Sequence, residues 1–337
     1  MASNQVFVLK KEKLPLFLEG LAKNYEVILP ARIDDNQDSV QFVPFDDGVE
    51  ADFSKQPYRP VKEIFFAKRE PLMTWDGKKI SVPEIKEKPK AVFGLRRCDL
   101  SAIHKQEVAF SGEYEDPYYR KRREDAVLIG YHCDEAPTEH CFCGSLPQED
   151  NFDLMLYDRG ESYLVEVGSE IGEKLVKRHK KEFEKSDKRI TGEDRKIRGL
   201  RTLDYSGIAG SKKHKAWDEL IEKCLSCSAC TAWCPTCYCH EIHDSVEPLD
   251  VSKGVRERSW SSCQLQSFTR VAGDEIFRKE RRERYLHRIF HQLLYFEEAN
   301  GEPLCVGCGR CITHCPTRID FVGALNEISG SSGGGGQ

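Results

Sequence analysis

The stretch CLSCSACTAWCP, residues 224–235, contains four cysteines in the pattern C-x2-C-x2-C-x3-C, followed by proline. The stretch CVGCGRCITHCP, residues 305–316, repeats this pattern. Three cysteines spaced in this way line a tight loop around one face of an iron–sulfur cubane, and the fourth lies about one helical turn further on and points away. Two copies in one chain are typical of bacterial ferredoxins that bind two [4Fe–4S] clusters.

The spacing also predicts which cysteines share a cluster, because the fourth cysteine of each run reaches the cluster of the other run. The expected ligands of the first cluster are Cys224, Cys227, Cys230 and Cys315. Those of the second are Cys305, Cys308, Cys311 and Cys234. Structural zinc is the alternative, but zinc usually takes pairs of cysteines separated by a spacer, and two sets of four that each end in Cys-Pro fit it poorly.

The insertion between the two runs contains three more cysteines, Cys237, Cys239 and Cys263. Cys237 and Cys239 follow the first Cys-Pro pair closely, so we expect them near the edge of the second cluster. One interpretation makes them packing thiols or hydrogen-bond partners beside that cluster. An additional metal or redox role is the other interpretation, and the role of Cys263 is equally open.

Four cysteines lie upstream of both runs, and two of them closely follow predicted buried strands. Cys98 comes after the strand at 90–95, and Cys133 after the strand at 126–131. If the helix predicted at 99–110 is a crossover, the two strands are parallel and are neighbours in the sheet or close to it. Both cysteines then emerge at the carboxyl edge, where open α/β sheets bind ligands.

The loop at 134–143 is long enough to fold Cys141 and Cys143 back over this edge. Together with the two cysteines at the strand ends, they predict a third [4Fe–4S] site. Buried, unliganded cysteine is the alternative, since this residue type is often buried without binding metal. Residues that could replace one of the four ligands are His132, His140, Asp99 and Glu139. Arg96 and Arg97 either stabilise cluster or partner charge or are ordinary surface arginines.

The pattern along the chain predicts two domains and a tail. Residues 1–210 alternate strand-like and helix-like segments, which indicates an α/β domain. Residues 211–328 are expected to form a mostly helical, two-cluster ferredoxin-like domain, with a long charged helix at 274–298. The tail at 329–337, SGSSGGGGQ, is expected to be flexible and to lie outside the fold.

Composition excludes several classes of function. The net charge is −5, and nucleic-acid-binding motifs are absent from the sequence. No apolar run approaches the length of a membrane span, and the first residues lack a signal peptide's apolar core, so we expect a cytoplasmic protein. In a reducing compartment, 15 cysteines are expected to be metal ligands, redox groups or buried residues rather than disulfides. No dinucleotide fingerprint, P-loop or haem-attachment motif occurs.

Several segments carry a family resemblance, among them VFGLRRCDLSAI at 92–103, CLSCSACTAWCPTCYC at 224–239 and CVGCGRCITHCPTRID at 305–320. They resemble the beta subunit of cytoplasmic nickel–iron sulfhydrogenases and, equally, the iron–sulfur electron-transfer subunit of anaerobic sulfite reductase. The resemblance covers most of residues 60–320. Two departures are CLSCSAC where CLSCGNC is common, and CDEAPTEHCFC where a glycine-rich loop is common.

The resemblance implies an electron-transfer subunit of a cytoplasmic multi-subunit oxidoreductase, without catalytic residues of its own. Its expected partners are a terminal module of hydrogenase, sulfite reductase or heterodisulfide reductase type and a flavin- and NAD(P)-binding subunit. An alternative is a disulfide- or sulfur-reducing site within the chain, at a cluster or at the thiols of the insertion. A zinc-stapled scaffold is a third hypothesis. The basic stretches at 177–181 and 278–284 are expected to be solvated helix faces or, alternatively, docking sites for an acidic partner.

Overall fold

The computed structural model describes residues 5–33, 39–46 and 48–332. By its internal contacts the chain divides into two units, neither of which is continuous in sequence. The first unit consists of Met1–Val61, Glu87–Arg201 and Val306–Cys308, and the second of Lys62–Lys86, Thr202–Cys305 and Gly309–Gln337. The chain leaves the first unit and enters the second between Arg201 and Thr202. The sequence pattern places the domain boundary at residue 210.

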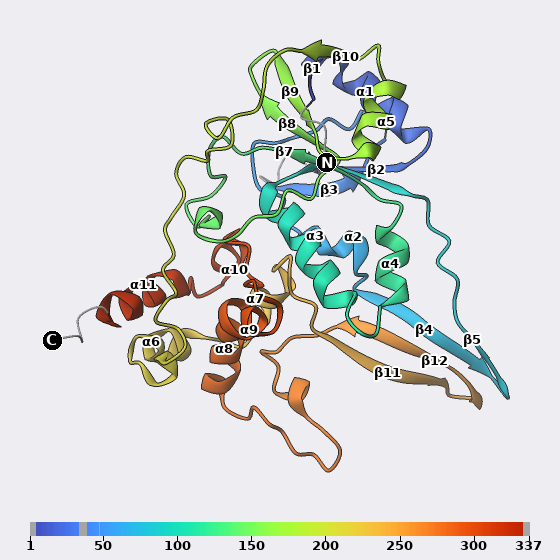
Figure 1. The fold of residues 1–337 in the computed structure, drawn as a ribbon. Coiled ribbons are helices and arrows are strands. Elements are labelled where there is room, and N and C mark those ends of the chain that lie inside the picture. Colours follow the sequence, from blue (N-terminus) through green and yellow to red (C-terminus); the bar gives the residue numbers. More distant parts are fainter. Residues whose placement is uncertain (1–4, 34–38, 47, 333–337) are drawn as a thin grey trace. The chain divides into compact units, whose positions relative to one another are not determined.

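The first unit is built on an eight-stranded mixed sheet in the order β10-β1-β9-β8-β7-β6-β2-β3 (Figure 1). Its strands are β1 (Val6–Lys10), β2 (Glu26–Arg32), β3 (Val40–Pro44), β6 (Lys90–Leu95), β7 (Val127–Tyr131), β8 (Leu154–Asp158), β9 (Ser162–Val167) and β10 (Phe183–Ser186). The four central strands β2, β6, β7 and β8 are parallel, and the outer pairings are antiparallel. The parallel pairing of the strands before Cys98 and Cys133 is therefore confirmed.

Helices cover both faces of this sheet. The helices of the first unit are α1 (Leu14–Ala22), α3 (Arg97–Phe110), α4 (Pro117–Arg123), α5 (Glu170–Arg178) and the short 3-10 turns Lys11–Lys13 and Cys143–Ser145. Phe17 of α1 and Leu175 of α5 join the same apolar core as Ile129 of β7. Successive residues of a strand face opposite sides of the sheet. Gly130, the residue after Ile129, therefore faces the other side, and there it lies against Leu100 of α3. Helix α3 therefore packs on the face opposite α1 and α5.

The second unit contains a four-stranded antiparallel sheet in the order β11-β12-β4-β5. Its strands are β4 (Arg69–Asp76), β5 (Lys79–Ser81), β11 (His240–Glu247) and β12 (Asp250–Trp260). Cross-strand ion pairs support it, including a buried pair in which Arg258 of β12 donates to Glu70 of β4 at 2.5 Å. The expectation that residues 211–328 are mostly helical is wrong for 240–260, because these residues pair with β4, which comes from much earlier in the chain.

The helices of the second unit surround the two cysteine runs. They are α2 (Lys62–Phe65), α6 (Ala216–Lys223), α7 (Ala229–Ala232), α8 (Arg281–Phe290), a π-helical turn His291–Tyr295, α9 (Phe296–Asn300), α10 (Arg310–Thr313), α11 (Phe321–Ser332) and the 3-10 turns Ser211–Lys213 and Gln266–Thr269. The long helix expected at 274–298 begins only at Arg281. There the Glu283 carboxylate accepts a hydrogen bond from the Glu280 N–H and caps the N-terminus. Residue Asp274, by contrast, has a left-handed backbone.

Two further expectations concern the chain end and the membrane. Residues 329–332 of the expected tail belong to α11, where the Ser329 hydroxyl donates to the Asp204 carbonyl at 3.1 Å, and residues 333–337 lie outside the described residues. Within the described residues, no helix combines the length and apolar character needed to cross a bilayer.

Candidate iron–sulfur sites

The two cysteine runs share an unusual backbone. The third and fifth residues of each run, counted from its first cysteine, have positive φ angles: 52° at Ser226 and 71° at Ser228 in one run, 67° at Gly307 and 72° at Gly309 in the other. A short helix follows each loop, α7 in the first run and α10 in the second. Left-handed residues are cheap for glycine and strained for serine, so the first run adopts the same loop at a cost of roughly 1–3 kcal/mol per residue. Strain of this kind is concentrated at ligand-binding sites.

Cysteines from both runs gather around Tyr285 of α8 in the second unit. Its phenol interacts electrostatically with Cys230, Cys224, Cys311 and Cys315. Burial, and then these thiols, raise the pKa of Tyr285 far above its usual value. The hydroxyl is buried and has no hydrogen-bond partner among the described residues. A buried donor without a partner costs roughly 1–3 kcal/mol, so the site fits a bound group that accepts a hydrogen bond.

Backbone amides and hydroxyls point at the sulfur atoms of the runs. The Ser226 N–H donates to Cys224 Sγ at 3.4 Å, and the Ile319 N–H donates to Cys315 Sγ at the same distance. Cys234 Sγ lies 3.2 Å from the Thr236 hydroxyl. Hydrogen bonds to sulfur are one of the means by which a protein sets the potential of an iron–sulfur cluster.

Two buried cations lie beside these thiols. The Arg288 guanidinium donates to the Cys230 carbonyl at 2.9 Å, while its Nε is buried without a hydrogen-bond partner in the described part of the chain. Burial opposes protonation of Arg288, but its thiol neighbours raise its pKa well above the ordinary value; these neighbours are Cys237, Cys234, Cys230 and Cys311. Lys62 donates to the Thr231 and Cys237 carbonyls at 2.9 and 3.1 Å. Burial lowers the pKa of Lys62, and the nearby Cys237, Cys234 and Cys239 thiols oppose that shift. Because a buried charge is costly without a counter-charge, both side chains fit a site that carries negative charge.

The remaining cysteines of the two runs differ in exposure. Cys227 is exposed, and Cys305 is partly exposed. Cys308 is buried, and with its two preceding residues it belongs to the first unit rather than the second. The sequence pattern does not predict that Cys308 belongs to the first unit, because the cysteine spacing describes the loop and not the residues that pack against it.

The first unit buries all four upstream cysteines. Cys98, Cys133, Cys141 and Cys143 are each less than a tenth exposed. Burial raises the pKa of the Cys143 thiol to about 12, with further contributions from Cys141, Cys133 and Cys308. Cys98 and Cys308 also share one apolar cluster. The four cysteines are thus brought into one region, with Cys308 as a fifth member that the sequence pattern did not predict.

Contacts within the first unit hold the loop of Cys308 against this region. Cys141 Sγ lies 3.8 Å from the Cys308 carbonyl, and the Gln56 amide donates to the same carbonyl at 3.1 Å. The Phe142 N–H donates to the Gly307 carbonyl at 2.8 Å. A Cβ on Gly307 would lie 2.6 Å from Cys143 Cα, so glycine is required here for close approach as well as for its positive φ.

The residues around the upstream cysteines have separate roles. Arg96 is buried and donates to Cys133 Sγ at 3.4 Å, whereas Arg97 pairs with Asp150. Asp99, one of the alternative ligands, lies in the first turn of helix α3, where its carboxylate accepts a hydrogen bond from the Arg96 N–H at 3.3 Å. Among the other alternative ligands, His132 is buried and its Nε2 lies 3.3 Å from the Lys196 carbonyl, whereas His140 and Glu139 lie 3.7 Å apart at the surface.

Zinc is disfavoured by the spacing of the thiols. A tetrahedral zinc–thiolate site with Zn–S bonds of about 2.3 Å needs sulfur atoms roughly 3.8 Å apart. Within either unit, no three cysteine Sγ atoms of the described residues lie within 4.8 Å of one another.

Comparisons with known proteins identify the family of the chain. A model of the 4Fe-4S dicluster domain matches residues 223–319. The chain is 33% identical over 287 residues to sulfhydrogenase 2 subunit beta of Pyrococcus furiosus, an alignment that covers 80% of this chain and 82% of the relative. The chain belongs to the sulfhydrogenase beta-subunit family. The matched dicluster domain contains both cysteine runs and supports the presence of iron–sulfur clusters in this family member.

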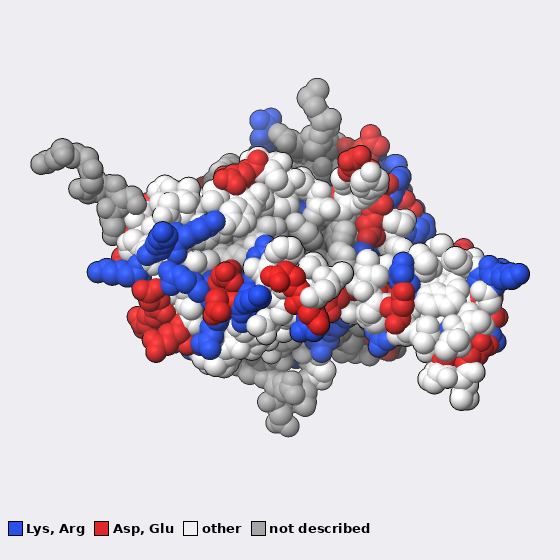
Figure 2. Space-filling view, turned by 90° about the horizontal axis from the view of Figure 1, so that it is seen from below, with Lys and Arg blue, Asp and Glu red and all other residues white. Residues whose placement is uncertain are grey.

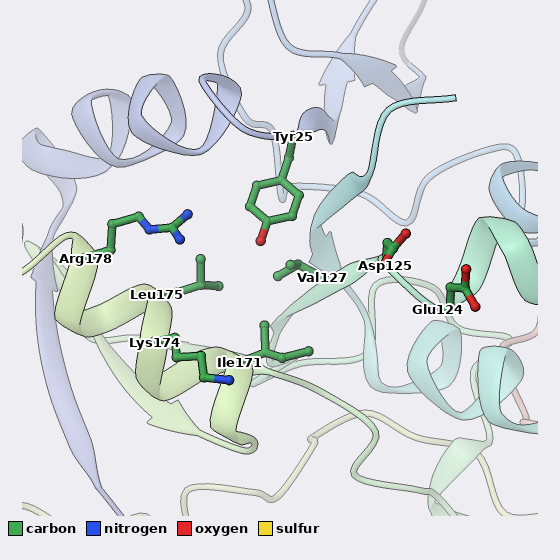
Figure 3. Close-up of a pocket in the computed structure, with 8 residues that line it drawn as sticks. All are labelled: Tyr25, Glu124, Asp125, Val127, Ile171, Lys174, Leu175 and Arg178. Carbon is green, nitrogen blue, oxygen red and sulfur yellow. The ribbon is translucent and has the colours of Figure 1, made fainter. Parts of the chain in front are cut away.

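Other surface features of this beta-subunit homologue add no residues to the candidate iron–sulfur sites. An open pocket on the first unit is lined by Tyr25, charged residues such as Lys174 and Arg178, and no cysteine (Figure 3). Acidic and basic side chains lie side by side across the face drawn in Figure 2. In the basic stretch at 278–284, Arg282 is paired with Asp218 at 2.5 Å, and Arg284 is buried and donates to the Gln264 carbonyl. Arg284 is therefore neither a solvated residue nor part of a docking surface.

Proposed function

We propose that this chain is the iron–sulfur electron-transfer subunit of a cytoplasmic multi-subunit oxidoreductase. It relays electrons between a terminal module of hydrogenase, sulfite reductase or heterodisulfide reductase type and a flavin- and NAD(P)-binding subunit. The observation that carries the proposal is the pair of ferredoxin-type cysteine runs in a chain that is similar along 80% of its length to a sulfhydrogenase beta subunit. The buried Tyr285 hydroxyl and the Arg288 Nε, which have no hydrogen-bond partner among the described residues, lie beside those cysteines and support it.

The proposed ligand sets follow the order of the cysteines along the chain. Cys224, Cys227, Cys230 and Cys315 hold one cluster, and Cys305, Cys308, Cys311 and Cys234 hold the second. Cys98, Cys133, Cys141 and Cys143 hold a third. When bound, each cluster carries one electron at a time.

Contacts within each unit bear on the proposed sets. The loop of Cys308, from the second set, packs against the upstream cysteines within the first unit. Within the second unit, Arg288 faces Cys230 of the first set and Cys234 of the second set. The chain's own part is to hold these positions, keep them buried and set potentials through hydrogen bonds and charge.

Iron analysis and low-temperature EPR of the dithionite-reduced full chain test the proposal. We expect about twelve iron atoms per chain, about four for each cubane. A value near eight would retain the two ferredoxin-type clusters and remove the third. A colourless preparation loaded with zinc would establish a scaffold and contradict the proposed function.

Arg288→Gln is expected to lower the reduction potential of the clusters beside it. The substitution removes a buried positive charge that favours the reduced, more negative form of each cluster. We expect a shift on the order of 60 mV, which is about a tenfold change in equilibrium for a one-electron couple. An EPR-monitored redox titration measures it.

Two matched variants separate charge from packing at this position. Arg288→Lys keeps the charge and should recover most of the potential. Arg281→Gln removes an exposed arginine from the same helix and should leave the potential unchanged. Equal potentials in the Arg288→Gln variant and the original protein would show that Arg288 has only a structural role.

A further inference from the structure

The three cysteines of the insertion meet at the open end of the β11–β12 hairpin. Strand β11 begins directly after Cys239, and β12 ends three residues before Cys263. His240 pairs with Trp260, and the Ser261 N–H donates to the Cys239 carbonyl at 2.9 Å, so the antiparallel pairing continues beyond the two strands. Extending that register places Cys237 opposite Cys263.

Their thiols form a hydrogen-bonded series with a proposed cluster ligand. Cys234 contacts Cys237, Cys237 contacts Cys239, and Cys239 contacts Cys263. The Gln292 amide donates to Cys237 Sγ at 3.7 Å, and its oxygen lies 3.8 Å from Cys234 Sγ. The series is anchored at its inner end, where the Lys62 ammonium donates to the Cys237 carbonyl at 3.1 Å.

Exposure differs along the series in a way that packing thiols do not require. Cys237 and Cys263 are buried, with 5% and 4% exposed, whereas Cys239 is partly exposed. A molecule from solution can therefore reach Cys239 first. Cys263 lies beside Cys239 as a second, protected thiol, and Cys237 connects both to Cys234.

Metal binding explains this arrangement less well. No three of these sulfur atoms lie within 4.8 Å of one another, so they do not form a preformed zinc site. A partly exposed thiol beside a buried one, as Cys239 is beside Cys263, is the arrangement of a reactive thiol and its resolving partner.

We propose that Cys239 and Cys263 are a redox-active dithiol that reduces small disulfides, with Cys237 connecting the pair to Cys234. This inference rests on the proposed function for its electron supply. The pKa of Cys239 is raised to about 11, so its proton passes to the departing sulfur as Cys239 attacks one sulfur of the substrate. A mixed disulfide forms and one thiol is released. Cys263 then attacks Cys239, releases the second thiol and closes the Cys239–Cys263 disulfide. Two electrons, delivered one at a time through the cluster held by Cys234, and two protons restore the dithiol.

The test uses the iron-loaded full chain, incubated without oxygen with oxidised glutathione and mapped by mass spectrometry. We expect a linked Cys239–Cys263 peptide in the original protein. In the Cys263→Ser variant the resolving thiol is missing, so a stable glutathione adduct should accumulate on Cys239. Cys239→Ser should lose both products, and Ser261→Ala, at the neighbouring position, should behave as the original protein does.

The iron content of the same samples separates the two proposals. Low iron contradicts the proposed function, whatever the peptide map shows. Full iron with all three thiols still free, and without an adduct on Cys239 in the Cys263→Ser variant, overturns the dithiol. A disulfide that joins any other pair of cysteines also overturns it.

Discussion

A chain with Cys315→Ala is expected to lose about four iron atoms, together with the EPR signal of the cluster whose other ligands lie about 90 residues earlier. Cys315 is the fourth cysteine of its run. Helix α10 separates it from the loop that contains the first three cysteines. Its sulfur accepts from the Ile319 N–H at 3.4 Å, and Tyr285 connects it electrostatically to Cys224 and Cys230. Removing it leaves three ligands, and the first cluster should not be retained.

Grouping the variants by their spectra tests the crossed arrangement. Cys315→Ala should lose the same signal as Cys230→Ala, whereas Cys234→Ala should lose the same signal as Cys311→Ala. Thr317→Val removes a hydroxyl that lies 3.5 Å from Cys315 Sγ but leaves the ligand, so its iron content should stay unchanged. If Cys315→Ala matched Cys311→Ala instead, each run would hold its own cluster and the ligand sets above would be wrong.

Much of the first unit could be predicted because its signals are local. The segments 90–95 and 126–131 are short apolar runs, and such runs are typical of buried parallel strands. Their pairing as β6 and β7 places Cys98 and Cys133 after neighbouring parallel strands. The two cysteine runs could also be recognised from the sequence, because the spacing typical of iron–sulfur sites is set by the shape of a cluster rather than by the surrounding fold.

The second sheet could not be predicted, because its strands carry no local sequence signal and pair with distant segments. Strand β11 is almost entirely exposed, so it lacks the apolar alternation that identifies a half-buried strand. Its partner β12 pairs with β4 from residues 69–76, and ion pairs such as Arg69 with Glu257 contribute to that pairing. Pairings between distant segments leave no local pattern. The same holds for Cys308, whose contacts with the upstream cysteines depend on the folded first unit.

Cys141→Ala is expected to reduce the iron content from about twelve to about eight atoms per chain and to leave both ferredoxin-type signals in place. Cys141 is buried, shares its surroundings with Cys133 and Cys143, and lies 3.8 Å from the Cys308 carbonyl. Cysteine binds metal as the thiolate, so metal binding and the loss of the proton are coupled at each ligand of the site. The loss should therefore be confined to the third cluster. Iron analysis with EPR of the reduced variant measures it.

His140 offers a matched control for this third site, because it precedes Cys141 and is one of the alternative ligands. His140→Gln should keep about twelve iron atoms if the four cysteines are the ligands. If His140→Gln lost iron and Cys143→Ala did not, a histidine would have replaced that cysteine in the set. An original protein with about eight iron atoms, unaffected by Cys141→Ala, would make the four upstream cysteines a buried cluster of thiols.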